Sequence, residues 1–476
     1  LIINYEEDKR VLFIGTNSGY LHAFNIDTDT AGEIFSFIPK ELLTNPDKYA
    51  NPQSSFDKVY GMDGKLSYWH KDTNYNGIVD GSDKVYLYAG MRRGGSSYYA
   101  LDITDPESPQ MAWQIHGTYQ TTEQNVPSMS NGFGRLGQSW SRALPVQIKW
   151  NGASRVVLFF SGGYDLANDS QTTRTADTYG NTIYMVDAET GALLWDAHDN
   201  ASLTGSMSYS IVSDPVVIDS DNNGYANLMY VADTGGQVWR FDFDEAVTDA
   251  ASFADAGVIA SVAGNGTSDD RRFLTNTDIS YISYDSDLPD AATADWDASG
   301  YILISIGSGN REKPLGTSIN DYHYLIKDVY GRNTPPSYTA LSMNSLAAWG
   351  SGDSNYGWYI ALTGNGEKSV STSSTFFGTV YFTTYAPKGD EASDICGGDT
   401  GNAKLYVVDI YHPDRTYSRT TIDQPYIPGS PVIAPLPASG EADQVASEYG
   451  VIVGTEAKET KTIYQNAIKN FWRSDD

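Results

Sequence analysis

Two short segments rich in aspartate and asparagine carry the residues best suited to chemistry in this sequence. The first spans residues 72–83 and reads Asp-Thr-Asn-Tyr-Asn-Gly-Ile-Val-Asp-Gly-Ser-Asp. Its first six residues fit the calcium-loop pattern D-x-[DN]-x-[DN]-G, in which positions 1, 3, 5, 9 and 12 supply side-chain oxygens and position 7 a main-chain carbonyl. Gly77, at position 6, permits the sharp turn that such a loop needs. The expected calcium ligands are Asp72, Asn74, Asn76, the carbonyl of Ile78, Asp80 and Asp83.

The second segment, residues 219–227, repeats the first half of this pattern but not its second half. Position 12 is Tyr230, so the segment itself has no closing carboxylate. Because ligand charge helps to set calcium affinity, we expect weaker binding here than in the first loop. An empty hairpin is the alternative for either loop. The expected ligands are Asp219, Asp221, Asn223, the carbonyl of Tyr225, and Asn227.

Apolar strands flank both loops, and the same kind of strand recurs along the whole chain. Six strands that each end in Asp or Asn finish at residues 25, 102, 187, 242, 328 and 409. Several follow a second apolar strand, as Ser97–Asp102 follows Val85–Gly90. A recurring antiparallel sheet is typical of a propeller blade. The sequence therefore predicts an all-β, modified β-propeller of seven blades with long loop insertions, forming one domain over residues 1–476. Six or eight blades, or a pair of β-sandwiches, would also give many short strands.

Composition restricts the partners of this chain. Sixty acidic residues stand against 31 basic ones, giving a formal charge of −29, and such a surface repels nucleic acid. The single cysteine, Cys396, excludes a disulfide within the chain and a zinc site built from cysteines. It is either paired outside the fragment or a free thiol. No segment has the length of a membrane span. The chain begins in mid-strand, so we interpret it as a fragment of a longer secreted protein.

Signatures of catalysis are absent from the sequence. The six histidines are scattered, and neither H-E-x-x-H nor G-x-S-x-G occurs. Residues 184–195 resemble the tryptophan-docking repeat of quinoprotein dehydrogenases, whose propellers hold pyrroloquinoline quinone. The Trp of that repeat packs between blades, and the vicinal cysteine pair of many such enzymes cannot form here. We therefore expect no enzyme, with a quinone-dependent dehydrogenase as the alternative and a passive scaffold as a third possibility.

An ordered set of segments spans nearly the whole chain: residues 15–24, 99–106, 233–242, 307–315 with Asp321, 357–359 with 366–368, and 381–387. Together they resemble the C-terminal propeller of the type IV pilus tip-associated adhesin and biogenesis family (the PilY/PilC family). The resemblance implies a bacterial protein exported to the cell surface and mounted, in association with the outer membrane, at the pilus tip. Pilin subunits or minor pilins would be its partners, along with host or abiotic surface receptors.

In this family the propeller acts in pilus biogenesis, adhesion and twitching motility, and its calcium site opposes pilus retraction. The family's calcium loop has the form D-x-D-x-D-G-x-x-D. By position it corresponds to residues 219–227, where Asn223 and Asn227 replace two of its carboxylates. The resemblance thus implies Ca2+ as the ligand, and the better-charged loop at Asp72 is expected to carry or share the role.

Overall fold

The computed structural model describes residues 1–5, 9–27, 32–44, 59–118, 127–200, 203, 206–246, 249–284, 295–388, 401–423, 426–435, 446–454 and 456–464. Within these residues the chain is all-β, with six short 3-10 helices and seven sheets, as the seven-blade prediction requires. Among the described helices, none combines the length and apolarity needed to cross a membrane. Cys396 falls outside the described residues, so its pairing stays a prediction.

The chain divides into two compact units, Leu1–Asn265 with Pro336–Ala340 (unit 1) and Gly266–Pro335 with Leu341–Asp476 (unit 2). One propeller domain over residues 1–476 stays a prediction.

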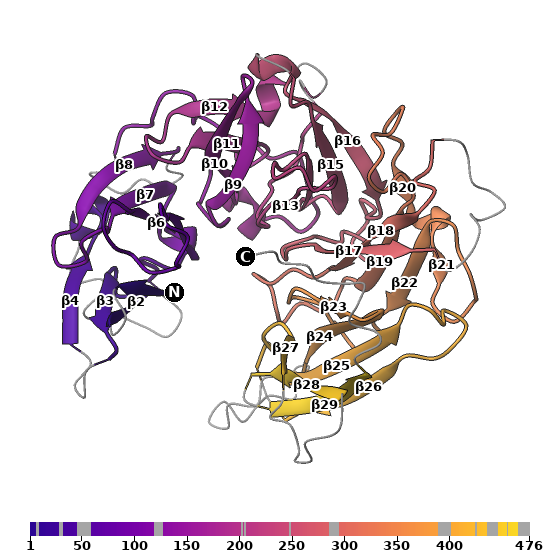
Figure 1. The fold of residues 1–476 in the computed structure, drawn as a ribbon. Helices are drawn as coiled ribbons and strands as arrows, with labels where there is room; N and C mark the ends of the chain where they lie inside the picture. Colours follow the sequence, from indigo (N-terminus) through magenta and orange to yellow (C-terminus); the bar gives the residue numbers. More distant parts are fainter. Residues whose placement is uncertain are drawn as a thin grey trace. The chain divides into compact units, whose positions relative to one another are not determined.

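Unit 1 contains four antiparallel sheets, and in each the strands lie side by side in chain order (Figure 1). The first sheet is β1 (Ile2–Tyr5), β2 (Lys9–Gly15), β3 (Leu21–Asn25) and β4 (Gly32–Phe37). The second is β5 (Leu66–Lys71), β6 (Lys84–Gly90), β7 (Ser97–Asp102) and β8 (Gln110–His116). The third is β9 (Leu144–Trp150), β10 (Ala153–Ser161), β11 (Ile183–Asp187) and β12 (Leu193–Asp196). The fourth holds β13 (Val216–Ile218), β14 (Leu228–Ala232), β15 (Gln237–Phe243) and β16 (Ala254–Ser261). The 3-10 helices are η1 (Lys40–Thr44), η2 (Arg92–Gly94), η3 (Leu166–Asp169), η4 (Ala197–Asp199) and η5 (Ala250–Ser252).

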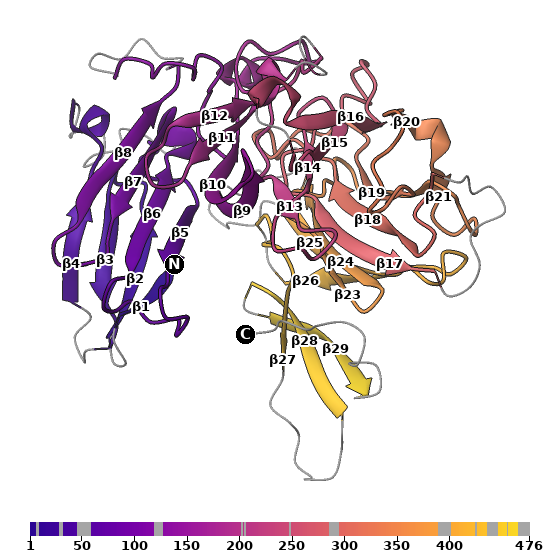
Figure 2. The ribbon, with the colours of Figure 1, turned by 45° about the horizontal axis from the view of Figure 1, so that its top comes forward.

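Unit 2 contains three sheets, and the last of them, drawn in yellow, is clearest in Figure 2. One sheet has the order β17-β18-β19-β22-β21, with β21 and β22 parallel. Its strands are β17 (Asp278–Ser283), β18 (Gly300–Gly307), β19 (Tyr322–Asp328), β21 (Ala347–Ala348) and β22 (Gly357–Ala361). The next is β23 (Ser374–Phe376), β24 (Thr379–Pro387), β25 (Gly401–Asp409) and β26 (Ser418–Ile422). The last is β27 (Val432–Pro435), β28 (Ala446–Val453) and β29 (Glu456–Tyr464). The unit also holds β20 (Leu341–Ser342) and η6 (Met343–Ser345).

The six recurring strands predicted from the sequence are the third strands of six successive sheets. They are β3, β7, β11, β15, β19 and β25. Their final Asp or Asn residues lie where each third strand ends or nearly ends. The repeat predicted from the sequence therefore corresponds to one structural unit, a meander of antiparallel strands.

Within each unit, neighbouring sheets pack face to face. In β10, Leu158 and Phe160 belong to the core shared with the second sheet, whereas Val157 and Phe159 belong to the core shared with the fourth. Successive side chains of a strand point to opposite faces, so a strand that is apolar at every position is buried on both. This explains why the middle strands are uninterrupted apolar runs.

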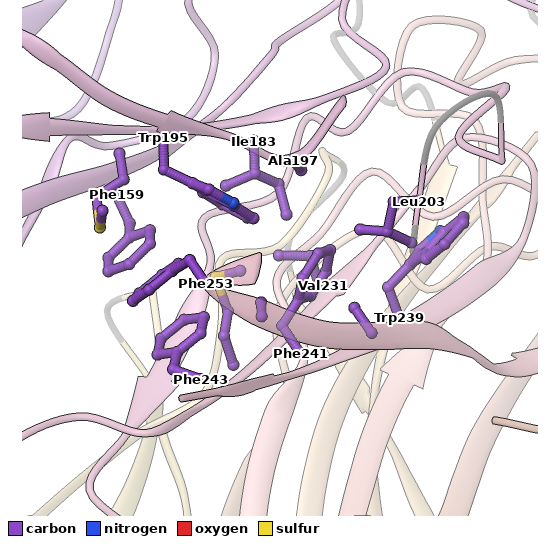
Figure 3. Close-up of a cluster of buried hydrophobic side chains, with 14 of the residues drawn as sticks. Phe159, Ile183, Trp195, Ala197, Leu203, Val231, Trp239, Phe241, Phe243 and Phe253 are labelled. Atoms are coloured by element: carbon purple, nitrogen blue, oxygen red, sulfur yellow. The ribbon is translucent and has the colours of Figure 1, made fainter. Parts of the chain in front are cut away.

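Trp195 fills the core between the third and fourth sheets. It comes from β12, is 1% exposed, and contacts Phe159, Phe241 and Phe253 with ring centroids 5.5–6.5 Å apart (Figure 3). The tryptophan of the docking-like repeat therefore packs between sheets, as the sequence predicts.

An alanine-rich stretch near residues 245–256 has the composition of a short helix. In the structure, residues 249–256 contain η5 and the start of β16 at Ala254, and no α-helix. Phe253 and Ala254 are buried in the same core as Trp195. Pairing of β16 with β15, together with this burial, outweighs the helix propensity of alanine.

Burial of Asp233, directly after β14, predicts a pH-dependent stability of unit 1. The residue is 0% exposed and accepts hydrogen bonds from Trp239 Nε1 at 2.8 Å and from two main-chain amides. Burial raises the pKa of Asp233 to about 7. The pKa of Asp in an unfolded chain is about 3.9. Because the pKa of Asp233 is higher in the folded state, this residue contributes its full stabilisation of the fold below about pH 4, and the contribution is lost as pH rises towards about 7.

For this reason we expect the urea concentration at the unfolding midpoint of unit 1 to decrease as pH rises from about 4 to about 7. Asp233→Asn, which cannot ionise, should flatten that slope, whereas the exposed control Asp105→Asn should not. An unchanged slope in Asp233→Asn would show that other groups dominate the titration.

Candidate metal centre

The first candidate loop, residues 72–83, joins β5 to β6 in the second sheet. The strands pair in register from Leu66↔Ala89 to Lys71↔Lys84, so the loop leaves and re-enters the sheet at adjacent points. In the second half of the loop, Val79 forms a parallel bridge with Tyr5 of β1, and the Val79 amide donates to the Asn4 carbonyl at 3.0 Å. The loop is thus fixed at both ends by sheet pairing.

Asp72, at position 1, organises the first half of this loop. Its Oδ2 accepts from the Gly77 amide at 2.8 Å, and its Oδ1 accepts from the amides of Tyr75 and Asn74 at 2.6 and 3.2 Å. Tyr75 and Gly77 have φ values of 60° and 72°, the left-handed region that wraps the chain around one carboxylate. These bonds lower the pKa of Asp72, the Gly77 amide contributing most.

The side chains at positions 3, 5 and 9 converge on one another. Asn74 Nδ2 donates to Asp80 Oδ1 at 3.0 Å, and Asn76 Nδ2 donates to Asp80 Oδ2 at 2.8 Å. The oxygens of the same two amides, Asn74 Oδ1 and Asn76 Oδ1, accept from the main-chain amides of Asn76 and Ile78 at 3.2 and 2.8 Å. The structure therefore brings Asn74, Asn76 and Asp80 within the span of one coordination sphere.

Asp83, at position 12, lies at the base of the loop and is 2% exposed. Its Oδ1 accepts from the Thr73 amide and hydroxyl at 2.8 and 2.7 Å, and its Oδ2 is 2.9 Å from His70 Nε2. The Thr73 amide contributes most to lowering the pKa of Asp83. Protein donors thus already satisfy this carboxylate, and its role as a calcium ligand stays a prediction.

The second loop joins β13 to β14, the equivalent hairpin of the fourth sheet, and its first half has the same local geometry as that of the first loop. Asp219 Oδ2 accepts from the Gly224 amide at 2.8 Å, and Asn223 Oδ1 accepts from the Tyr225 amide at 2.8 Å. The first loop has the same two bonds between positions 6 and 1 and between positions 7 and 5. Position 4 is left-handed in both, with φ of 60° at Tyr75 and 58° at Asn222. The shared sequence pattern therefore dictates a shared backbone.

The second half of this loop differs from the first loop. Asn227 Oδ1 accepts from the Ser220 amide at 2.9 Å, which ties position 9 to position 2. Partial desolvation, followed by the neighbouring Asp219, raises the pKa of Asp221. A neighbouring like charge disfavours the ionised form of a carboxylate.

Sequence reasoning missed a third carboxylate at the second loop. Glu245, which follows β15, places Oε1 2.8 Å from Asn223 Nδ2, the same amide that lies 3.1 Å from Asp221 Oδ2. Its other oxygen is 4.0 Å from Lys149 Nζ. Glu245 thus supplies an acidic group to a loop that lacks one at its own position 12. Only the pairing of β14 with β15 brings it there, so no local pattern could have revealed it.

Oxygen atoms dominate both loops, and carboxylate, amide and carbonyl oxygens are the ligands that Ca2+ prefers. The residues present therefore fit a calcium ion in each loop. In the first loop Asn74 and Asn76 both contact Asp80, and Asp72 accepts from main-chain amides of the same turn. The second contributes Asp219, Asp221 and Asn223 with Glu245 nearby.

This protein is a β-propeller with structured hairpin insertions. Its antiparallel sheets stack on one another, and in two of them the hairpin between the first and second strands carries a calcium-loop sequence. The sequence matches the PilY1 beta-propeller domain family over residues 5–309, and the chain belongs to that family. The family resemblance inferred from the ordered motifs is therefore confirmed.

Known relatives agree with this assignment. The chain is 26% identical over 432 residues to a type IV pilus biogenesis factor PilY1 homolog of Xylella fastidiosa (strain Temecula1 / ATCC 700964), covering 84% of this chain and 26% of that protein. It is 27% identical over 235 residues to the type IV pilus biogenesis factor PilY1 of Pseudomonas aeruginosa strain PAO1, covering 48% and 17%. The chain thus spans about a quarter or less of the length of these relatives. The crystal structure of the P. aeruginosa PilY1 C-terminal domain shares its fold, with a TM-score of 0.61 at 18% identity over 95% of this chain and 92% of that one.

Proposed function

We propose that this chain is the calcium-binding propeller of a type IV pilus biogenesis factor. The observation that carries the proposal is the pair of loops whose first halves share one main-chain geometry, set in equivalent hairpins of a PilY1-family propeller. The relatives are named as pilus biogenesis factors, which supports a role in pilus assembly. Placement at the bacterial surface, at the pilus tip, with pilin or minor pilin partners follows from that role. Adhesion and twitching motility belong to the same proposal.

Bound calcium would order the two loops. The described loop residues Asn74–Gly77 and Asp221–Gly224 are exposed, so side-chain packing contributes little to their conformation. A bound cation would neutralise Asp72 and Asp80, or Asp219 and Asp221, and replace weak amide bonds with metal–oxygen bonds. The loops would then become rigid platforms at one end of their sheets. A platform ordered only with calcium provides a physical basis for controlling pilus extension and retraction.

Thermal unfolding with calcium and with chelator tests the binding. We expect calcium to raise the unfolding temperature, with a stabilisation of about 2.7 kcal/mol at about one hundred times Kd. Asp72→Ala with Asp80→Ala should remove most of this shift, and Asp219→Ala with Asp221→Ala a smaller part. In the first double variant, Glu245→Gln should reduce what remains.

The control is Asp105→Ala with Glu107→Ala, which removes the same charge from an exposed turn between β7 and β8. If this control loses as much of the shift as the loop variants, the effect is one of net charge and the specific sites are rejected. A twitching assay of cells carrying each double variant in the full-length protein then tests the link to the pilus. Normal motility despite lost calcium binding would separate the two halves of the proposal.

The dehydrogenase alternative rested on the repeat that contains Trp195. Inter-sheet packing accounts for that residue, and no observation in the described residues favours quinone binding over the pilus role. Reconstitution with pyrroloquinoline quinone, followed by an alcohol oxidation assay, would detect such an activity directly.

A further inference from the structure

We propose that His70, Asp72 and Asp83 form a site for a borderline divalent cation, with Zn2+ as the representative ion. Their candidate ligand atoms, one imidazole nitrogen and two carboxylate oxygens, all lie within 4.8 Å of one another. Calcium sites use oxygen ligands, whereas zinc takes imidazole nitrogen together with carboxylate oxygen. The calcium-loop pattern begins at Asp72 and does not include His70. The imidazole is therefore the feature that the pattern leaves unexplained.

The distances suit a small cation after a minor adjustment. Zinc bonds of about 2.0–2.2 Å place tetrahedral ligand atoms about 3.3–3.6 Å from one another. His70 Nε2 and Asp83 Oδ2 are 2.9 Å apart, so a small outward shift of either side chain would admit the ion between them. Entry of the ion would replace the hydrogen bond between these two groups and draw one Asp72 oxygen inward. Water would complete the coordination shell, as at zinc sites with three protein ligands.

Neighbouring groups already hold the two carboxylates and the main chain of His70. The Thr73 amide and hydroxyl hold Asp83 Oδ1, and Oδ2 lies 2.9 Å from His70 Nε2 and accepts from the Asp80 amide at 3.3 Å. The Gly77 amide holds Asp72 Oδ2, and the amides of Tyr75 and Asn74 hold its Oδ1. His70 itself pairs with Val85 in the β5–β6 register, so its main chain is fixed by the sheet. Such outer contacts reduce the cost of arranging ligands around an ion.

Burial separates this end of the loop from the calcium end. The Asp83 side chain is 0% exposed and that of His70 is 12% exposed, whereas Asn74, Asn76 and Asp80 lie in the exposed part of the loop. Partial exclusion of water strengthens the attraction between a dication and two carboxylates. The site can hence form without any contribution from the exposed residues.

Sharing of ligands would make the two ions compete. Asp72 is position 1 and Asp83 position 12 of the proposed calcium loop, so one loop would not hold both ions with full coordination. This competition rests on the proposed calcium function, whereas zinc binding does not. Zinc would consequently act as an antagonist of calcium at the first loop and leave the second loop unaffected.

Titration calorimetry with ZnSO4 in calcium-free buffer, together with Co2+ absorption, tests the site on the whole chain. We expect one ion per chain at this site and a loss of zinc affinity of at least about tenfold in His70→Gln. Glutamine retains a donor for Asp83, so the hairpin should fold and the calcium-induced rise in unfolding temperature should persist. The matched control is His412→Gln, because His412 Nδ1 also lies 2.9 Å from a carboxylate, that of Asp409, and is not in the cluster.

The outcomes separate the two proposals. Zinc binding lost in His70→Gln and kept in His412→Gln supports the site, whether or not calcium binds. Zinc binding that survives His70→Gln, or that is absent from the unaltered chain, overturns it. If zinc binds through His70 but does not reduce calcium binding, the zinc site stands and the shared-ligand competition is rejected.

Discussion

Trp195→Ala is expected to lower the free energy of unfolding of unit 1 by about 3–5 kcal/mol, the usual cost of removing a large aromatic side chain from a core. The indole packs among three phenylalanine rings drawn from both the third and fourth sheets. Its removal therefore leaves a cavity at the contact between sheets and does not weaken one strand alone. Because close-packed rings have little freedom to move, relaxation of the neighbours can fill only a small part of that space.

Chemical denaturation, with calorimetry as a second method, would measure this loss of unfolding free energy. Trp195→Phe is the matched control: it keeps an aromatic ring, and the Nε1 it removes has no hydrogen-bond partner among the described groups. We expect the control to lose less than half as much stability as alanine. Equal losses would show that the indole's shape, and not the burial of an aromatic ring, holds the two sheets together.

Glu367→Ala should destabilise unit 2 by about 3–5 kcal/mol, because it removes one partner of a buried ionic network. Glu367 is 1% exposed and accepts from Thr384 Oγ1 at 2.7 Å, the Gly364 amide at 2.8 Å, Tyr406 OH at 2.9 Å and Lys404 Nζ at 3.1 Å. Burial alone would raise the pKa of Glu367, but these donors and the Lys404 charge hold it below its usual value. Alanine would leave the two hydroxyls and the ammonium group without their acceptor.

Denaturation at several pH values would check this prediction. Because the pKa of Glu367 is lower in the folded state than the unfolded value of about 4.3, its carboxylate stabilises the fold above that pH. This stabilisation is lost as pH falls through the folded-state pKa. The unaltered chain should therefore lose more stability on acidification than Glu367→Ala. Glu367→Gln keeps the size and one acceptor and should lose less than alanine. If alanine costs under about 1 kcal/mol, the network is no more than a surface-like ion pair.

This network also explains the motif around Gly366-Glu367-Lys368. The Lys368 amide and carbonyl pair with Tyr385 across an isolated bridge, and Lys368 Nζ donates to the Gly366 carbonyl at 2.7 Å. Segments 366–368 and 381–387 are separate motifs in the sequence. Their contact shows that they belong to one buried assembly.

Local information was sufficient for much of this protein. Periodic apolar strands predicted the third strand of six sheets, since strand period and turn chemistry are written in neighbouring residues. The D-x-[DN]-x-[DN]-G pattern likewise predicted the main-chain turn of both loops, because Asp72 and Asp219 bond amides only a few residues away. The proposed zinc ligand His70 was visible only as a scattered histidine.

Contacts between distant segments determined the remainder. Glu245 reaches the second loop through the β14–β15 pairing, and Phe253 and Ala254 join the core that holds Trp195. In each case the energy comes from burial or from a partner that the residue meets only once the sheets have formed. Sequence spacing records which groups can meet along a strand or turn, whereas packing decides which carboxylates gather and which are already satisfied.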